Sequence, residues 1–452
     1  MSRGTQSIPV GRLLFVADRK AVPHAFRSRL FSRSACLVIA YVILALAVFG
    51  TITSTIVFIL AVLGAIKFRG YRDRDRKQYE KFAAQLPPVS VLKPVHGNES
   101  RLKENIESFF RQEYPHYEIL FAADEPDDAA IPIIREISSR YPHIPSRILV
   151  TGQPPWPNAP NYCFHRLSEI ATYDILVTSD SDVEVAPTYL QDLVPPLLDP
   201  KVGAVTCAFR GKSAGGIWAD LDAIGQSVEF TAGVLIANLM EGTKFGLGPT
   251  IALRKDSIGK IGGYAAVREY LSNDFVVGNF IHKAGFEVWL SSHVVDHVSP
   301  KMTFRRMWER QLRWAMGTRY SRPKGHFGSG LTFAVPFGIL GLIAASVLGH
   351  PWLGVALLAA ALVNRIAESW IIGWWAAGDP VAKRAALLYP IRDLHGFIIW
   401  CASYLSKRSL WRDNNYVLLK KGRLIARRAN GALVTPDAPE VIAGEPLMRA
   451  DR

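Results

Sequence analysis

Residues 174–182 read DILVTSDSD, a short apolar strand that runs directly into Asp180 and Asp182. Short strands and helices alternate before it, with strands at 89–94, 117–123 and 147–150 and helices at 102–110 and 130–139. This alternation predicts an α/β fold with a mostly parallel sheet. In such sheets ligands bind beyond the carboxyl ends of the strands, so the residues that follow each strand are the first functional candidates.

The acids that follow the strands are of two kinds. Asp180 and Asp182 offer two carboxylates one residue apart, and Mg²⁺ or Mn²⁺ binds such oxygens and completes its shell with diphosphate oxygens. This pair is therefore expected to hold a divalent metal. The strand over 117–123 also ends in acids, and for Asp127 and Asp128 the alternative interpretation is simple turn or cap chemistry.

Two later segments carry further candidates. Asp274 stands before an apolar helix, where it is either an N-terminal capping acid or a general base. Arg310, Arg313 and Trp314 are spaced i, i+3 and i+4, on one helix face. Arginine matches phosphate oxygens, and an indole offers a flat platform for a sugar or acceptor. The alternative is an amphipathic helix that lies on a membrane.

The formal net charge of +14 in this 452-residue chain is confined to its two ends. Residues 1–77 carry +10 and residues 406–452 carry +5, whereas the 328 residues between them carry −1. Because the body is near neutral, no nucleic-acid partner is expected, and the basic ends fit anionic membrane lipids instead. The four cysteines have no CxxC or metal-ligand spacing, which argues against a zinc site or a disulfide framework.

Apolar segments flank the body. Residues 35–66 are uncharged and long enough to span a bilayer as a helix, and a cleaved signal peptide fits them poorly. Residues 331–349 and 352–377 predict further spans, and residues 385–405 predict either a span or a helix in the interface. The basic stretch 67–77 favours a cytoplasmic body, and an interfacial last segment would keep the basic tail on the same side.

The C-terminal apolar segments contain charges that are unfavourable at bilayer depth. Arg365 and Glu368 are three residues apart and can pair along a helix, whereas Arg392 and Asp393 are adjacent and cannot face one partner. We interpret these side chains either as structural pairs or as contacts along the path of a lipid substrate.

The ordered set of motifs resembles the ceramide glucosyltransferase family of GT-A glycosyltransferases, and hopanoid-type lipid glycosyltransferases are closely similar. The motifs are Lys93-Pro94, Tyr114-Pro115-x-Tyr117-Glu118, the acids after residue 123, Asp180-Ser-Asp182, residues 248–254, Asp274 and Arg310-x-x-Arg313-Trp314. The resemblance covers roughly residues 35–425. It implies a Rossmann-like GT-A domain with transmembrane helices at both ends, and inverting transfer of a sugar from a UDP donor to a lipid alcohol.

The resemblance also implies a role for each matched residue. Asp180 and Asp182 hold the metal and the diphosphate, and Asp274 takes the proton of the acceptor hydroxyl. The motif of Arg310, Arg313 and Trp314 lies near the diphosphate and the acceptor. The residues expected to contact the UDP-sugar are Lys93, Asp124, Glu125 and Asp180.

The chain departs from the family pattern at three places. Glu125 stands where an Asp is usual, with Asp124 just before it, and Asn273 replaces an acid. The usual Lys is missing from the segment 158–160, which is expected to weaken donor binding or shift the sugar preference. His297 matches a family histidine and has either a functional or a loop-structural role.

The expected organisation has six parts: a basic extension (1–34), a transmembrane helix (35–66), a basic juxtamembrane linker (67–85), a GT-A domain (86–330), transmembrane or interfacial helices (331–405) and a basic, partly disordered tail (406–452). The expected reaction is glucose transfer to ceramide on the cytoplasmic face. The alternatives are transfer of N-acetylglucosamine to a hopanoid or other lipid, a processive polysaccharide synthase with a larger helix bundle, and a non-enzymatic membrane scaffold.

Overall fold

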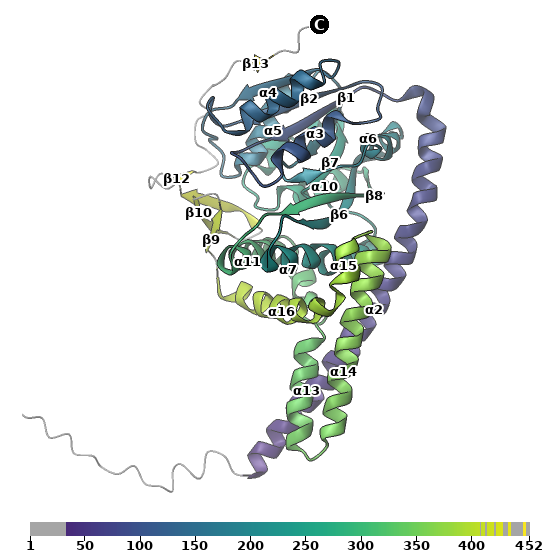
Figure 1. Ribbon diagram of the computed structural model, residues 1–452, viewed down its shortest axis with the longest axis vertical. Coiled ribbons are helices and arrows are strands. Elements are labelled where there is room, and N and C mark those ends of the chain that lie inside the picture. Colours follow the sequence, from purple (N-terminus) through teal and green to yellow (C-terminus); the bar gives the residue numbers. More distant parts are fainter. Residues whose placement is uncertain are drawn as a thin grey trace, which may run out of the picture.

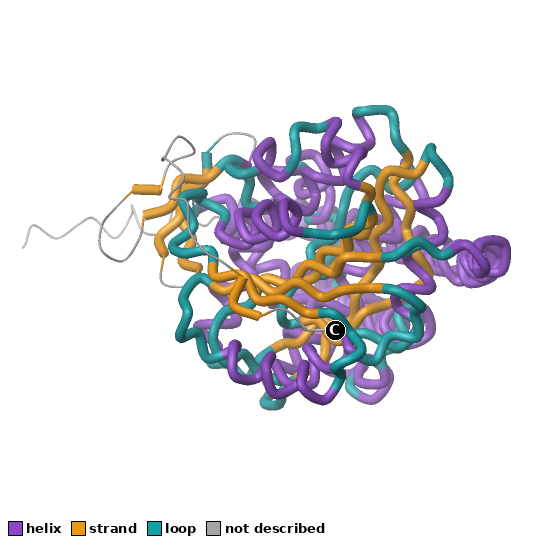
Figure 2. The backbone as a smooth tube through the Cα atoms, turned by 90° about the horizontal axis from the view of Figure 1, so that it is seen from above, coloured by secondary structure: helices purple, strands orange, loops and turns teal. Residues whose placement is uncertain are grey.

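The computed structural model describes residues 33–406, 408–411, 414–419, 422–427, 433–434 and 446–448. The predicted basic extension lies outside these residues except for its last two positions, and so does much of the predicted disordered tail. A nine-stranded sheet forms the centre of the body, in the order β13-β3-β2-β1-β4-β7-β6-β8-β5. Figure 2 shows the sheet with helices on both sides.

The first half of the sheet is parallel and follows the sequence pattern closely. Its strands are β1 (Val89–Pro94), β2 (Tyr117–Ala123), β3 (Ser146–Val150) and β4 (Ile175–Ser179). They are almost wholly buried, which accounts for their continuous apolar runs. The predicted α/β class with a mostly parallel sheet is confirmed.

The second half of the sheet is mixed. β7 (Thr250–Arg254) is antiparallel to both β4 and β6 (Val202–Ser213), and β6 is parallel to β8 (Glu287–Ser299). The short β5 (Val183–Glu184) and β13 (Pro446–Met448) complete the edges. The turn between β4 and β5 contains Asp180 and Asp182, so the sheet places these acids at the carboxyl end of a central strand.

Helices cover the two faces of the sheet with separate cores. α3 (Leu102–Phe110), α4 (Ala130–Arg140) and α6 (Tyr189–Leu193) pack on one face. α5 (Ala159–Ile170), α9 (Lys255–Lys260) and α10 (Asn273–Lys283) pack on the other. A third core joins α2 (Arg33–Phe82) to α7 (Ile217–Gly225), the π-helical turn η3 (Gln226–Phe230) and α8 (Thr231–Glu241).

Three apolar helices project from the body as a bundle. α2, α13 (Val335–Val347) and α14 (Pro351–Glu368) pack side by side, and η5 (Ser369–Ala376) continues α14 (Figure 1). α2 continues through most of the predicted linker, 67–85, because nothing in that basic stretch breaks a helix. Asp75 anchors α2 to β8, accepting hydrogen bonds from the Trp289 indole (3.1 Å) and the Ser292 amide (2.6 Å).

α16 (Tyr389–Leu405) has a different direction from the bundle. It runs across the end of the bundle that adjoins the body, together with α11 (Phe304–Ser321) and α7 (Figure 1). Three described helices are long and apolar enough to cross a membrane: 35–85, 217–241 and 351–376. In the helix over 217–241, 67% of the most apolar window is buried inside the protein, so this helix belongs mainly to the body.

Candidate active site

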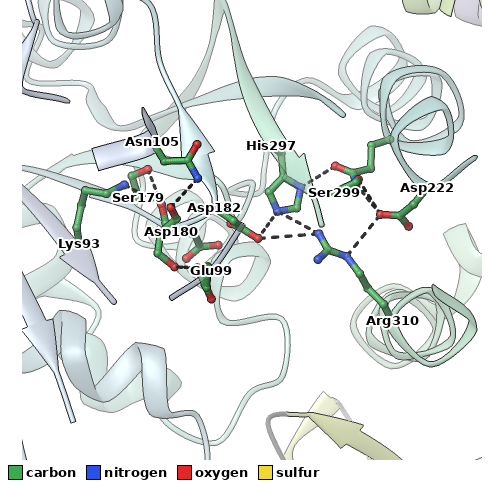
Figure 3. A network of polar contacts seen from close by, with 12 residues as sticks. Lys93, Glu99, Asn105, Ser179, Asp180, Asp182, Asp222, His297, Ser299 and Arg310 are labelled. Atoms are coloured by element: carbon green, nitrogen blue, oxygen red, sulfur yellow. Dashed lines mark hydrogen bonds and ion pairs between the residues drawn. The ribbon is translucent and has the colours of Figure 1, made fainter. Parts of the chain in front are cut away.

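The turn that carries Asp180 and Asp182 is fixed through its backbone. Lys93, at the end of β1, donates from Nζ to the carbonyl oxygen of Asp180 (2.7 Å), and Asn105 of α3 donates to that of Ser181 (3.2 Å). Ser181 also donates a short hydrogen bond to Glu99. Figure 3 shows these side chains converging on the turn. Buried neighbours thus hold the turn without using the carboxylates of Asp180 and Asp182 in these three bonds.

Lys93 is fully buried, and its ammonium group lies 3.7 Å from the centre of the Phe109 ring. Burial lowers the pKa of Lys93 to about 7, although the carboxylates of Asp180, Asp182 and Glu99 act in the opposite direction. The lysine predicted to contact the donor thus contacts the backbone of the turn that carries the two aspartates.

His297 of β8 connects Asp182 to the helical layer. The side-chain amide of Gln226 donates to Asp222 (3.0 Å) and Ser299 (2.8 Å), so its oxygen is the acceptor for His297 Nδ1 at 2.6 Å. This leaves Nε2 of His297 facing Oδ2 of Asp182 at 3.2 Å. His297 is held by the chain on one side and lies against the candidate metal ligand on the other.

Arg310 of α11 lies between two carboxylates. Its Nη2 is 4.0 Å from Asp182 Oδ2, and its Nε is 3.6 Å from Asp222 Oδ2 (Figure 3). The guanidinium lies 4.5 Å from the centre of the Trp314 ring, which places both on the helix face that the spacing predicted. Arg313 is half-buried on the same helix. Arg310 therefore faces the carboxylate of Asp182, the candidate metal ligand, at a distance longer than a hydrogen bond.

Asp222, Gln226 and Ser299 are members of this network that sequence reasoning missed. Asp222 is 1% exposed and accepts hydrogen bonds from Gln226, Ser299 (2.9 Å) and Gln311 (2.9 Å). A signal for it was present, because an acid inside the apolar run 217–225 is unfavourable to bury unless it has partners.

Asp274 lies at the start of α10 and approaches the same region from the other side. A Cβ atom added to Gly248 would lie 3.1 Å from Asp274 Oδ2 and 3.9 Å from Asp180 Oδ2. The two carboxylates therefore converge on one small space that a glycine keeps open. Burial raises the pKa of the Asp274 carboxyl above its ordinary value, and the backbone amides of Phe275 and Gly248 partly offset this.

The acids at the end of β2 lie two strands away from β4. Asp124 lies 3.9 Å from the Cys163 sulfur and 3.9 Å from His96 Nδ1, whereas Glu125 accepts a hydrogen bond from Gln153 at 3.1 Å. Asp128 accepts from the amides of Gly97 (2.9 Å) and Ala130 (2.8 Å), which is the turn-and-cap chemistry considered for it.

The segment that lacks the expected lysine is tied to the loop before Asp274. Asn158 caps α5 by accepting from the Asn161 amide (3.1 Å). Its own amide donates to the carbonyl oxygen of Tyr270 (2.8 Å) and lies 3.3 Å from Asn273 Oδ1. Asn158 thus joins the start of one helix to the loop that positions the start of another.

Among the residues that the structure describes, no group of three or more His, Cys, Asp or Glu side chains is arranged to hold a metal ion. The two carboxylates of the turn nevertheless fit Mg²⁺ or Mn²⁺ in a nucleotide-sugar site. Magnesium at such sites is bound through one or two carboxylates, and substrate phosphates and water supply the other ligands. The donor set is therefore adequate for a metal that arrives with a diphosphate.

Comparison with known proteins identifies relatives. The family described as "Glycosyl transferase family 21" matches residues 19–424. Ceramide glucosyltransferase 1 of Caenorhabditis elegans is 27% identical over 230 residues, which cover 51% of this chain and 49% of the relative. A ceramide glucosyltransferase of Candida albicans is 32% identical over 24% of this chain and 22% of its own length. The chain spans about half the length, or less, of these curated relatives.

Among solved structures, a mannosyltransferase from Pyrobaculum calidifontis in complex with GDP-Man and Mn²⁺ is similar, with a TM-score of 0.40 and 17% sequence identity. The match covers 77% of this chain and 99% of that chain.

Proposed function

This chain belongs to glycosyl transferase family 21, and on that premise we propose that it is an inverting enzyme that moves a hexose from a UDP-sugar to a lipid alcohol. We propose glucose as the sugar and ceramide as the acceptor, because ceramide glucosyltransferases are among its curated relatives. The observation that carries the proposal is the convergence of Asp180 and Asp274 on Gly248.

The proposed reaction needs a base for the acceptor hydroxyl and positive charge for the leaving diphosphate. Asp274 supplies the base: a carboxylate beside the donor site takes the proton as the hydroxyl oxygen attacks the anomeric carbon. Burial raises the pKa of Asp274 toward neutral pH, which makes the carboxylate a stronger base for the proton transfer. Inversion follows because the hydroxyl attacks from the face opposite the diphosphate.

Arg310 is the chain's own counter-charge for the diphosphate. Its guanidinium lies 4.0 Å from Asp182 and stacks on Trp314, so its planar face is fixed while its outer N–H groups face the metal-side turn. Arg313 and Trp314 are proposed to complete this side of the site. Lys93 is proposed to act through the turn, because its ammonium donates to the backbone of Asp180.

Asp180 and Asp182 would hold the divalent metal together with the donor diphosphate. When bound, the metal supplies Lewis-acid stabilisation of the charge on the leaving group. His297 would help to position Arg310 beside Asp182: with Nδ1 donating to Gln226, its Nε2 is an acceptor that lies 3.4 Å from Arg310 Nη2 and 3.2 Å from Asp182 Oδ2. Asp124 and Glu125 are proposed to contact the nucleotide from the end of β2.

α2 and α14 with η5 are long and apolar enough to cross a membrane, whereas α13 is a shorter apolar helix. We propose that α2 and α14 span the bilayer and that α13, with the flanking residues of 331–349, is embedded beside them. The basic stretch of α2 then lies beside the body, since Asp75 is anchored to β8, and we propose from this basic stretch that the body lies on the cytoplasmic face. α16 would lie in the interface, so the tail stays on the side of the body. A bundle of this size favours single transfer over secretion of a polymer.

The test is an assay of the purified full chain in detergent with Mn²⁺, a total lipid extract and one labelled donor at a time: UDP-glucose, UDP-galactose or UDP-N-acetylglucosamine. We expect a labelled glycolipid from UDP-glucose that co-migrates with glucosylceramide. A product formed only from UDP-N-acetylglucosamine would replace the proposed donor. Absence of any glycolipid would overturn the proposed activity.

A further inference from the structure

A polar stripe, buried at Asp222 and Gln226 and partly exposed at Glu229, leads from the candidate active site toward the bundle. It is formed by Asp222, Gln226 and Glu229 on the continuous helix of α7 and η3, at positions i, i+4 and i+7. Asp222 and Gln226 bond to the network around Arg310 and His297. Glu229 lies 2.8 Å from Nη2 of Arg392 on α16. A π-helical turn at this point is notable because such turns are frequent at functional sites.

The far end of this stripe contains polar atoms that the protein itself does not satisfy. Arg392 is 7% exposed, yet its Nε and Nη1 have no hydrogen-bond partner in the described part of the chain. The same is true of both ring nitrogens of His395, one turn further along α16. Buried donors and acceptors are nearly always partnered, so these four atoms have the capacity to bind a polar ligand.

Glycines make room for the guanidinium of Arg392. A Cβ atom at Gly225 would lie 2.3 Å from its Nε, and one at Gly396 would lie 2.9 Å from its Nη1. Any larger residue at either position would displace the guanidinium. Gly225 on α7 and Gly396 on α16 therefore both leave space for the side chain of Arg392.

The surroundings of His395 are aromatic, and exposed apolar side chains lie on the same helices, α7, α11 and α16. Its ring lies 5.9 Å from Phe304 and 5.8 Å from Trp308, and Phe304 lies 5.1 Å from Trp218. Ile217 and Phe304 are exposed at the starts of α7 and α11, and α16 exposes Ile391 and Ile398. Apolar chains can pack on this surface while a polar group reaches His395.

We infer that His395, Arg392 and Glu229 bind the polar headgroup of the acceptor lipid, between α7, α11 and α16. The group that they fit is uncharged, because Glu229 already neutralises Arg392 and would repel a phosphate. A neutral imidazole offers one donor and one acceptor, which match a secondary amide next to the reacting hydroxyl. This inference rests on the proposed function and names the headgroup chemistry that the site selects.

His395→Phe in the full chain is the decisive variant, because it keeps the aromatic contacts and removes only the two unpartnered nitrogens. With C6-ceramide in phosphatidylcholine nanodiscs, we expect the KM for ceramide to rise about three- to tenfold. The KM for the UDP-sugar should stay unchanged. Thermal stability should stay the same or increase, since an unsatisfied polar group is lost from the free protein. A merely structural histidine would instead lower stability.

His350→Phe is the matched control, the same substitution at the exposed turn between α13 and α14, and it should leave both KM values unchanged. Dioctanoylglycerol lacks an amide N–H, so its KM should be higher than that of ceramide. His395→Phe should reduce the difference between these two KM values. An unchanged KM for ceramide in His395→Phe, or a fall in stability that accompanies any change, would overturn the inference.

A second measurement separates this inference from the proposed function. Binding of a fluorescent C6-ceramide is measured without any UDP-sugar, in wild type and in His395→Phe. If wild type forms no glycolipid but His395→Phe weakens ceramide binding, the proposed reaction fails and the headgroup site stands. If wild type forms glycolipid and His395→Phe binds ceramide equally well, only the headgroup site fails.

Discussion

The cluster of charges at the top of the helix bundle and the candidate active site both consist of arginines and carboxylates, but they arrange these groups differently. In the bundle cluster, defined as Arg365, Glu368 and Asp393, Arg365 is 3% exposed and lies 2.7 Å from Glu368 and 3.3 Å from Asp393. Asp393 also accepts from the amides of Ala334 (3.1 Å) and Val335 (2.8 Å). The carboxylates of this cluster thus have internal partners that tie α13, α14 and α16 together.

The active site keeps comparable groups further apart. The side chain of Asp182 is 26% exposed, and Nη2 of Arg310 lies 4.0 Å from its Oδ2. A buried carboxylate held by short ion pairs and backbone hydrogen bonds indicates a structural role, whereas a carboxylate that is partly exposed to solvent can still bind a ligand. The bundle cluster is therefore interpreted as structural, which decides between the two interpretations that the sequence allowed for Arg365 and Glu368.

Replacing Asp274 by Asn should have the largest effect of any single change. The amide keeps the shape of the side chain but cannot accept the hydroxyl proton, so kcat should fall by about 10³-fold. Binding of the UDP-sugar, measured calorimetrically with Mn²⁺, should change little. Turnover comparable to wild type would refute the base role.

The pH dependence of the wild-type enzyme supplies the control for that variant. Asp274 must be deprotonated to act as a base, so kcat should fall as pH decreases through its pKa. Because burial raises this pKa, the fall should begin at a higher pH than for an ordinary aspartate. The residual activity of Asp274→Asn should lack this acidic limb.

Replacing Arg365 by Met should affect folding more than chemistry. The change leaves Glu368 and Asp393 buried without their cation, and breaking a buried pair in this way destabilises a protein by about 3–5 kcal/mol. The thermal midpoint in detergent should fall strongly. Arg305→Met is the matched control, because Arg305 is 84% exposed and pairs with Glu309 at the surface. Equal midpoints for the two variants would contradict the structural interpretation.

The sequence predicted the parallel half of the fold well because local signals and tertiary structure agree there. Strands at 89–94 and 117–123 are buried on both faces, so their apolar runs were unambiguous. The helix over 217–241 was not predicted. Its apolar run is mostly buried in the body, and this placement depends on tertiary packing, which composition alone does not specify.

The candidate site was predictable only where residues carry chemistry on their own. The pair Asp180 and Asp182 follows a strand, and the spacing of Arg310 and Trp314 defines a helix face. The contact of His297 with Gln226 joins residues 71 positions apart, and no local pattern encodes such a pairing. The roles of the nine predicted site residues stay predictions, and the variants at Asp274 and Asp182 test two of them directly.

Replacing Asp182 by Ala should weaken metal-dependent donor binding by about a hundredfold, since even outer-shell partners contribute about 10–100-fold to metal affinity. The measurement is calorimetric binding of UDP-glucose with and without Mn²⁺. Asp127→Ala is the control, because Asp127 is an exposed acid that follows β2, two strands away from β4. Retained Mn²⁺-dependent binding in Asp182→Ala would show that Asp182 is not a metal ligand. Asp182 would then be structural, like the carboxylates of the bundle cluster.

The smallest effect is expected at Asn158, which lies near the site but makes structural contacts like those of the bundle cluster. Asn158→Ala removes the cap of α5 and the hydrogen bond to Tyr270, and should lower the free energy of unfolding by about 1–2 kcal/mol. Asn158→Asp keeps the capping oxygen and loses only the donor, so it separates the two contributions. If both variants raise the KM for the UDP-sugar to the same extent, the donor to Tyr270 matters for substrate and the loop before Asp274 depends on it. If neither changes the KM, the segment without its lysine contributes to stability alone.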